Sequence, residues 1–208
     1  MDKDDFVARY PRLIHMAHGD AWPGIQRHGL LSASQLVRLF ESPDADSLLV
    51  QRRSDATQLT HAEHGSAVLR DQGPLNEAKL AGALTDGMTV QDWLRQLNRL
   101  AFFFPTESGL DTMLKVYGHE PVVVLTVGTA SLVREYEWSI RLASINTGSV
   151  LYRPAPRGRD TFLSIRRFDH TKRSVKEIAV EDGVPNVLDH LQKAERRLPD
   201  GTTMRLDG

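Results

Sequence analysis

The side chains of this chain that could do chemistry are acids, histidines and arginines, because cysteine is absent from all 208 residues. That absence excludes disulfides, thiolate metal sites and cysteine nucleophiles. Glu177 is the acid in the most unusual setting, inside the apolar stretch VKEIAV and just before the turn DGVP. On a strand it would share one face with Val175 and Ala179. That face meets water in most proteins, and in a functional site it would present the carboxylate to a cleft.

Two pairs of histidines have the three-residue spacing of a metal site: His15 with His18, and His61 with His64. Neither pair fits HExxH, and no third ligand stands close to either pair in the sequence. We therefore predict that the protein holds no metal and that His61 and His64 are solvated loop residues.

Glu135 and Glu137 flank Tyr136 and have the composition of a general acid and base pair. On a strand they would share a face, whereas at a helix end they would be surface charge. The sequence around them gives no sign of a cleft, so we interpret them as surface charge.

Cations concentrate in the segment 153–173. They usually mark a solvated face, but the Pro and Gly around Arg157 and Arg159 also suit a mobile loop that binds an anionic partner. The whole chain does not favour such a partner, since 26 Lys and Arg side chains face 27 Asp and Glu and the net charge is −1. Any nucleic-acid contact would therefore come from this patch: Arg153, Arg157, Arg159, Arg166, Arg167, Lys172 and Arg173, against Asp160 and Asp169.

The elements that must position these residues are mostly helices in the first half of the chain and strands in the second. Helices are predicted where apolar residues recur at helical spacing after a cap: Asp20 with a stop at Gly29, Ser32 with Gln35, and Thr89 with Asp92. A further helix is expected around 110–117, a closing helix over 184–197, and mostly loop with some helix over 42–66. Strands are predicted at 100–105, 121–127, 138–143, 161–165, 175–180 and 202–206.

This segregation predicts a single α+β domain over residues 1–208, with a mixed or antiparallel sheet. The sequence contains no GxGxxG, GxxxxGK[ST] or GxSxG, which removes the signatures of dinucleotide folds, P-loops and serine nucleophile elbows. Apolar runs are far shorter than a bilayer requires, and the acidic start MDKDDFVARYPRL differs from a signal peptide. We expect a cytoplasmic protein with no membrane contact.

Three blocks follow one another along the chain: LIHMAHGDAWPGIQRHGLLS, LNRLAFFFPTESGLDTML and VKEIAVEDGVPNVLDHL. Together they resemble the ADP-ribosyltransferases, in particular the DarT-type nucleic-acid enzymes and a related uncharacterised bacterial family. The resemblance spans most of the chain and implies NAD as the substrate. It also implies a split mixed or antiparallel β core with helices concentrated in the N-terminal half. The second block reads FFFP where an FYF-like pattern is expected.

The resemblance also implies a role for each matching residue. His15 on the first strand would hold the nicotinamide end or the adenosine ribose of NAD, and Phe103 would stack near nicotinamide. Glu177 would be the catalytic glutamate. Arg70 is the best match for an arginine that contacts the NAD phosphates and assists catalysis, with Arg52 and Arg53 as alternatives. The complete set is Glu177 and Arg70 as catalytic residues, and His15, Met16, Ser32 and Phe103 as NAD-binding residues.

The chemistry of these residues suits that reaction. Breaking the bond between nicotinamide and ribose builds positive charge on the ribose, which a neighbouring carboxylate stabilises. A neutral imidazole can bond a ribose hydroxyl, an aromatic ring can cover nicotinamide, and arginine pairs with a pyrophosphate. The first expectation is therefore transfer of ADP-ribose from NAD to nucleic acid, with release of nicotinamide.

Several alternatives remain open for the acceptor and for the activity itself. The acceptor could be a protein, or water in an NAD glycohydrolase, and a non-catalytic nucleotide-binding domain would share the fold. The related RNA 2′-phosphotransferases are less similar, because their arginine and histidine pattern is not found. The loops NTGS and PRGRD would stand where such folds recognise the acceptor, but match no known target motif. By the same resemblance the protein would be a toxin with an antitoxin partner.

Overall fold

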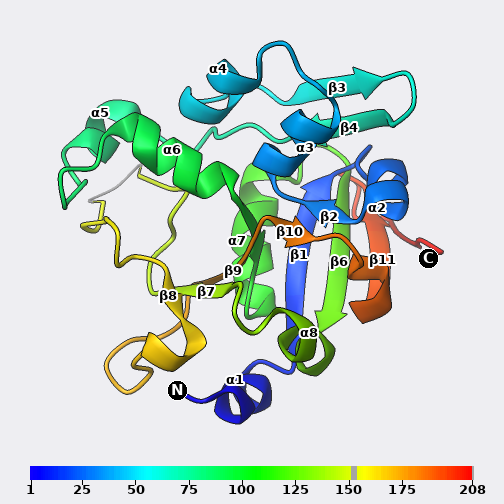
Figure 1. The fold of residues 1–208 in the computed structure, drawn as a ribbon. Helices are drawn as coiled ribbons and strands as arrows, with labels where there is room; N and C mark the ends of the chain where they lie inside the picture. Colours follow the sequence, from blue (N-terminus) through cyan, green and yellow to red (C-terminus); the bar gives the residue numbers. More distant parts are fainter. Residues whose placement is uncertain (151–153, 208) are drawn as a thin grey trace.

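Two four-stranded antiparallel sheets organise the computed structural model, which describes residues 1–150 and 154–207 (Figure 1). The first sheet has the order β1-β6-β11-β12 and the second β5-β9-β7-β8. Every ladder between the described strands is antiparallel, so the predicted α+β class is confirmed. The strands of the first sheet are Arg12–His18, Val122–Gly128, Leu191–Arg197 and Thr203–Arg205, and those of the second are Leu100–Phe103, Glu177–Glu181, Ile140–Ala143 and Leu163–Ser164.

The two sheets meet where β1 approaches β5. Ile14 and Phe104 exchange backbone hydrogen bonds of 3.0 and 2.7 Å, just beyond the end of β5. In the second sheet β5 pairs with β9, with Phe103 opposite Ile178. The strand β5 therefore lies between the first strand of the chain and the strand that starts with Glu177.

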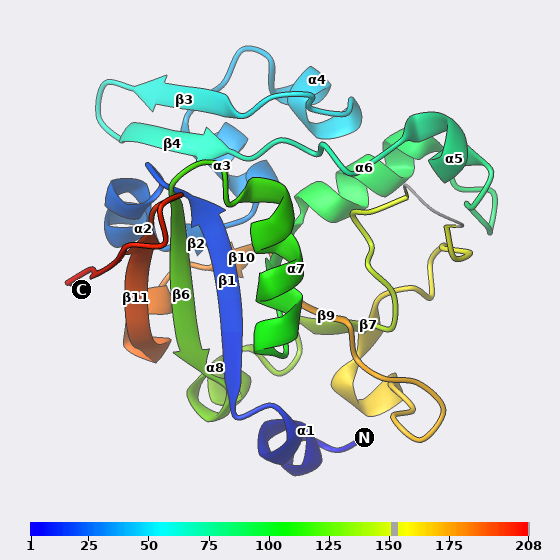
Figure 2. The same ribbon diagram turned by 180° about the vertical axis from the view of Figure 1, so that it is seen from behind.

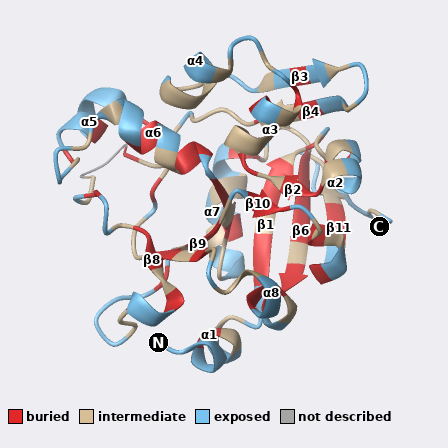
Figure 3. Ribbon diagram, in the orientation of Figure 1, coloured by how far each residue is buried: buried red, intermediate tan, exposed pale blue. Residues whose placement is uncertain are grey.

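The core follows from the apolar strands. β6, VVVLTVG, is β-branched and buried along nearly all its length, as expected for a central strand with both faces covered (Figure 3). On one face of the first sheet, Ile14, Met16 and Val124 pack against helix α7, Glu107–Tyr117 (Figure 2). Its other face forms the main core with the second sheet and with helices α1, Lys3–Arg9, and α8, Thr129–Tyr136.

The remaining elements surround this core. Helices α3 and α4 pack over the hairpin of β3 and β4, and α5 and α6 cover the second sheet around Trp93. The short strands β2 and β10 pair near the middle of the molecule. The helices and strands around the core have the bounds Trp22–His28 for α2, Leu30–Leu31 for β2, Ala33–Leu39 for α3, Ala45–Val50 for α4, Thr57–His61 for β3, Gly65–Leu69 for β4, Glu77–Ala81 for α5, Val90–Asn98 for α6 and Gly183–Val184 for β10.

The predicted closing helix over 184–197 is wrong. A 3-10 turn, Val187–His190, leads into β11, which pairs with both β6 and β12. Within β11 the buried Ala194 faces the core while Lys193 points to the opposite face, so the strand period holds there. Pairing with the central strand β6 overrides the helical spacing of this stretch.

The segment 42–66 contains more structure than predicted, since the hairpin of β3 and β4 begins within it. Leu59 and Ala67 of this hairpin are buried against α3 and α4. Asp20 does not cap α2 as expected: the N-cap is Ala21, without a side-chain cap, although Pro23 and the stop at Gly29 are where they were predicted. The caps at Ser32 and Thr89 are confirmed.

Across the described residues, the helices are all too short or too polar to cross a membrane.

Candidate functional site

A cavity of about 320 Å³ lies between the two sheets, the N-terminal end of α3, β4 and α7. Five of the six predicted site residues line it: His15, Met16, Ser32, Arg70 and Glu177. They come from four separate segments of the chain, which the fold brings to one space.

The two residues farthest apart in sequence reach this cavity across a single strand. His15 follows Ile14, which pairs with Phe104, and Glu177 precedes Ile178, which pairs with Phe103. Continuing the antiparallel register places Glu177 opposite Phe104. Since neighbouring strands are ~4.8 Å apart, the backbones of β1 and β9 are separated by about 10 Å here. His15 and Glu177 thus lie on either side of one cleft.

Glu177 stands at the first position of β9, where its face turns toward the cavity. Within β9 the side chains alternate as expected, because Ile178 and Val180 enter the main core while Ala179 joins the opposite cluster. The predicted sharing of a face with Val175 is wrong: β9 begins at Glu177, and Val175 packs in the main core with Ile178 and Val180. Thr147 donates two hydrogen bonds to Oε2 of Glu177, from its backbone N at 3.0 Å and from Oγ1 at 2.5 Å.

The ionisation of Glu177 reflects this environment. Burial raises the pKa of Glu177 to about 7, against the opposing effects of the Thr147 hydrogen bonds and the charge of Arg157. The carboxyl is therefore divided between its two protonation states near neutral pH. This is the range in which a carboxyl can act both as a charge and as a proton acceptor.

His15 is held as a neutral imidazole. Its Nδ1 lies 2.7 Å from the carbonyl oxygen of Phe102, and because a carbonyl only accepts, Nδ1 carries the proton. Burial lowers the pKa of His15 to about 4; the bond to Phe102 opposes this and the charge of Arg70 adds to it. Nε2 is consequently an acceptor at neutral pH, suited to a hydroxyl donor.

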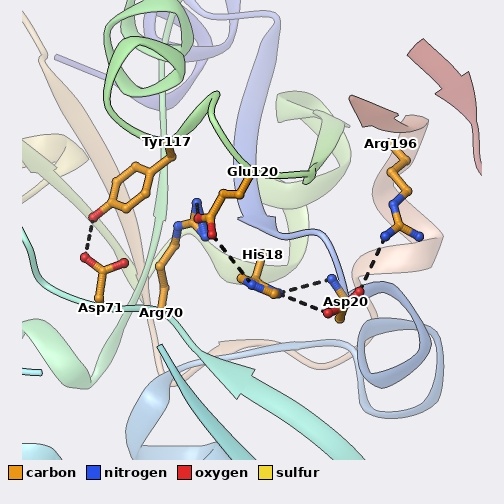
Figure 4. Close-up of polar contacts among 7 residues, drawn as sticks. All are labelled: His18, Asp20, Arg70, Asp71, Tyr117, Glu120 and Arg196. Carbon is orange, nitrogen blue, oxygen red and sulfur yellow. Dashed lines mark hydrogen bonds and ion pairs between the residues drawn. The ribbon is translucent and has the colours of Figure 1, made fainter. Parts of the chain in front are cut away.

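Arg70 lines the cavity and belongs to a small polar network with Glu120, Tyr117 and Asp71 (Figure 4). Its Nη2 contacts Glu120 at 2.8 Å, and its guanidinium stacks 4.0 Å from the centre of the Tyr117 ring. Tyr117 in turn donates a hydrogen bond to Asp71 at 2.9 Å, and burial followed by the charge of Asp71 raises the pKa of its hydroxyl. Glu120 also lies 4.0 Å from His18.

The guanidinium of Arg70 has hydrogen-bond donors that are not used within the described residues. Its Nε and Nη1 are buried, and neither has a hydrogen-bond partner among the described residues. Buried donors without partners are costly and rare, so they mark a place where an acceptor from a ligand would bind. The contacts with Tyr117 and Glu120 hold the guanidinium in position for it.

The two alternative arginines are engaged in holding the fold. Arg53 lines the cavity, but its three nitrogens donate to Arg70 O, Leu48 O and Asn98 Oδ1 at 2.6–3.1 Å. Burial lowers its pKa to about 10 against the charge of Asp71. Arg52 donates to the carbonyls of Gln72 and Gly73. Of the three, Arg70 has the geometry of an anion-binding residue.

Phe103 does not line the cavity, which corrects its expected role beside nicotinamide. It is fully buried in the main core, where its ring meets His15 edge-on at 5.7 Å. The aromatic residues of this segment that line the cavity are Phe102 and Phe104. Successive residues of a strand point to opposite faces, so the side chain of Phe103 enters the core while those of Phe102 and Phe104 point to the other side of the strand.

Ser32 closes the cavity at the start of α3. Its buried Oγ accepts a hydrogen bond from Gln35 N at 3.3 Å, and its backbone N donates to Asp182 O. The chain reaches this point through Gly29, with φ of +77° and ψ of −172°, where a Cβ would lie 1.8 Å from the oxygen of Pro185. The GLLS turn is therefore held directly against the turn that follows β9.

Several cations of the segment 153–173 are buried or paired with acids, and the sequence alone did not indicate this. Arg157 is 2% exposed and belongs to the interior, not to a mobile loop. Arg166 pairs with Glu137, Arg167 with Asp160 and Lys172 with Asp169, and the Arg173 guanidinium lies over Phe168. Arg153 lies outside the described residues.

Glu135 and Glu137 are at the end of α8, as predicted, and Glu135 is a surface charge, 50% exposed. The side chain of Glu137 is largely covered and pairs with Arg166, which departs from the surface-charge interpretation. His61 and His64 are half-buried: His61 ends β3, which corrects its expected place in a loop, whereas His64 lies in the turn that follows. Their rings stack at 4.6 Å, and His64 also meets His28 and Phe40. Even so, in the part of the chain that the structure describes, no group of three or more His, Asp or Glu has the arrangement of a metal site.

Sequence reasoning missed Thr147, Tyr117 and Glu120. Thr147 belongs to NTGS, which was expected to meet the acceptor, yet it donates to Glu177. Tyr117 closes the apolar stripe of α7, so its spacing indicated core packing alone. No pattern linked Glu120 to Arg70, because they are 50 positions apart and meet only in the fold.

Comparison with known proteins gives a family and no activity. The model of DUF7002, a family of unknown function, matches residues 11–191. This range includes every residue described above as lining the cavity. No curated protein matches the chain.

Proposed function

The chain belongs to the DUF7002 family, and we propose that it is an NAD-dependent ADP-ribosyltransferase that modifies a macromolecule, with nucleic acid as the first acceptor. The observation that carries the proposal is the shared cavity: a neutral His15 and the acid Glu177 line it from opposite sides of β5, with the donor-rich Arg70 at one end. This set matches what cleavage of NAD requires of a protein.

Each group has a role in the proposed reaction. Arg70 would bind the pyrophosphate through its unpartnered donors, and Nε2 of His15 would accept a hydrogen bond from a ribose hydroxyl. Phe102 and Phe104 replace Phe103 as the aromatic residues that would border nicotinamide. Met16 and Ser32 would complete the walls.

Glu177 would act when the glycosidic bond breaks. The electron pair of that bond leaves with nicotinamide, and positive charge develops on the ribose beside the carboxylate. An acceptor nucleophile then bonds to the anomeric carbon and loses a proton, which Glu177 can take. The products are the ADP-ribosylated acceptor, nicotinamide and a proton.

A nucleic-acid acceptor would bind through exposed cations of the segment 153–173, which now form ion pairs with carboxylates. Arg166 and Arg167 are 64% and 67% exposed, and Lys172 is 81% exposed. Exposed pairs contribute ~0–1 kcal/mol, so phosphates can replace their carboxylates at little cost. By the resemblance stated above, the protein would act in the cytoplasm as a toxin with an antitoxin partner.

The test is to incubate the purified protein with NAD and with DNA, RNA or cell lysate, and to measure nicotinamide release and the mass of each acceptor. We expect release together with addition of one ADP-ribose to nucleic acid. Labelled protein, or release without labelling, would replace the acceptor with protein or with water. If nicotinamide is not released but NAD raises the melting temperature, the domain binds the nucleotide without turnover. If nicotinamide is not released and NAD does not raise the melting temperature, the proposal is overturned.

The Glu177→Gln variant separates the enzyme from a contaminant. We expect it to lose ~10²–10³-fold or more of the activity while it still binds NAD, because the carboxylate acts on charge that develops in the transition state. Expression of the wild-type protein without an antitoxin would arrest growth, and expression of Glu177→Gln would not.

A further inference from the structure

Arg157 is a buried cation with no carboxylate bonded to it among the described residues. It is 2% exposed, and its guanidinium donates to three carbonyls: Nη1 to Thr147 at 2.9 Å, Nε to Ala155 at 3.2 Å and Nη2 to Ser149 at 3.4 Å. It also lies 5.7 Å from the centre of the Trp93 ring. Burying an unpaired charge costs stability, so its retention calls for a role.

Two of the three carbonyls that Arg157 binds, those of Thr147 and Ser149, belong to the loop that holds Glu177. Thr147 accepts from Arg157 through its carbonyl and donates to Glu177 through its backbone N and Oγ1. Thr147 is itself 1% exposed. A continuous line of hydrogen bonds therefore runs from the guanidinium through one residue to the acid in the cavity.

The backbone of Arg157 is fixed as firmly as its side chain. Its N donates to Ala83 at 2.9 Å and its carbonyl accepts from Thr85 at 2.9 Å, which ties it to the segment after α5. The guanidinium thus clamps the loop 147–149 to a part of the fold that lies outside the second sheet. Two further bonds hold the same loop, from Ser149 N to Asn146 Oδ1 at 3.0 Å and from Val150 N to Pro74 O at 3.2 Å.

We propose that Arg157 is a positioning residue for Glu177, acting through Thr147 to hold the carboxylate in its orientation toward the cavity. The proposal rests on the function proposed above for Glu177. Two donors on one carboxylate oxygen favour the charged form, and the nearby guanidinium charge does the same. Arg157 therefore also keeps the buried acid ionisable near neutral pH.

The test compares Arg157→Gln, Arg157→Lys and the wild-type protein in two measurements. The first is the titration of Glu177 by NMR with labelled carboxyl carbons, its signal assigned with Glu177→Gln. The second is the pH dependence of kcat and KM for nicotinamide release. Arg141→Gln is the matched control, because Arg141 lies in the same sheet and pairs with Glu181 away from the cavity.

We expect Arg157→Gln to raise the proton affinity of Glu177 tenfold or more, so that its pKa rises by about one or more. The acidic limb of the kcat profile moves to higher pH by the same amount. kcat at pH 7 falls by about fivefold or more, because the ionised fraction of Glu177 drops from about one half to about one tenth, while KM for NAD changes by less than ~3-fold. Arg157→Lys, which keeps the charge, recovers part of kcat. Arg141→Gln leaves the titration of Glu177 and the pH profile at their wild-type values.

A folded Arg157→Gln protein with an unchanged Glu177 titration and an unchanged pH profile would overturn the proposal. If Arg157→Gln does not fold, Thr147→Val decides, since it removes one of the two donors to Glu177: a higher pKa supports the proposal and an unchanged pKa overturns it. A wild-type protein that titrates as described but releases no nicotinamide refutes the proposed function instead, since the NMR measurement is independent of turnover.

Discussion

Replacing Glu177 with glutamine should stabilise the protein at alkaline pH, although the residue is central to the proposed site. Glutamine keeps the size of the side chain and an oxygen that Thr147 can bond, but it carries no charge into the buried position. In the wild-type protein, burial makes the charged form of Glu177 unfavourable and raises its pKa from 4.5 to about 7. A functional acid that lowers the stability of its own fold is a trade-off expected at active sites.

The magnitude follows from the two pKa values. In the unfolded chain Glu177 ionises near pH 4.5, and in the folded protein near pH 7. Below pH 4.5 both states are protonated and the charge costs nothing; above pH 7 both are ionised and the folded state carries the whole cost. At ~1.4 kcal/mol for each tenfold change in proton affinity, that cost is about 3 kcal/mol, and it develops as the pH rises from 4.5 to 7.

The assay is urea unfolding of both proteins from pH 4.5 to pH 8.5. We expect equal stabilities at pH 4.5 and an advantage of about 3 kcal/mol for Glu177→Gln above pH 8, or about 5–10 °C in melting temperature. Glu195→Gln is the control of opposite sign, because bonds from Lys193 and Arg197 lower the pKa of Glu195 against the effect of burial. If Glu177→Gln is no more stable than the wild type at pH 8, the carboxyl is not in the environment described here.

Three further predictions follow from the same geometry. In ¹⁵N NMR spectra, His15 should stay neutral down to about pH 4, with the proton on Nδ1. Because its pKa is lower in the folded than in the unfolded state, its contribution to the free energy of unfolding is present above pH 6.5 and lost as the pH falls toward 4. A charged His15 at pH 6 would contradict this. Arg70→Lys should weaken NAD binding ~10–100-fold in calorimetry, whereas Arg52→Lys, outside the cavity, should not; equal effects would refute the assignment of Arg70. Gly29→Ala should cost ~3 kcal/mol or more in urea unfolding, against ~1 kcal/mol for Gly87→Ala, which has positive φ and open space; similar costs would show that the turn at Pro185 yields.

Much of the fold could be predicted because local patterns and tertiary structure agree in the central strand of the first sheet and at the caps of α3 and α6. The β-branched run of β6 and the reciprocal bonds of Thr89 and Asp92 are examples. The stretch 184–197 shows the limit: its spacing suits a helix, but Ala194 and its neighbours pair with β6, and no local pattern records the presence of that partner.

The candidate site was predictable to the level of strands, and not always to the level of faces. His15 and Glu177 lie on the strands predicted for them and line the cavity, whereas the neighbouring side chain of Phe103 lies in the core. The bonds from Thr147 to Glu177 join positions 30 apart through a loop, and loop conformation has no periodic signal in the sequence.

A crystal structure of Glu177→Gln with NAD would show whether His15 and Glu177 face one dinucleotide from opposite sides of a single cavity. We expect the nicotinamide ribose within hydrogen-bond distance of residue 177, ~3 Å, a ribose hydroxyl on Nε2 of His15, and the pyrophosphate on Arg70. NAD bound elsewhere, or bound in this cavity with its ribose out of reach of residue 177, would contradict it.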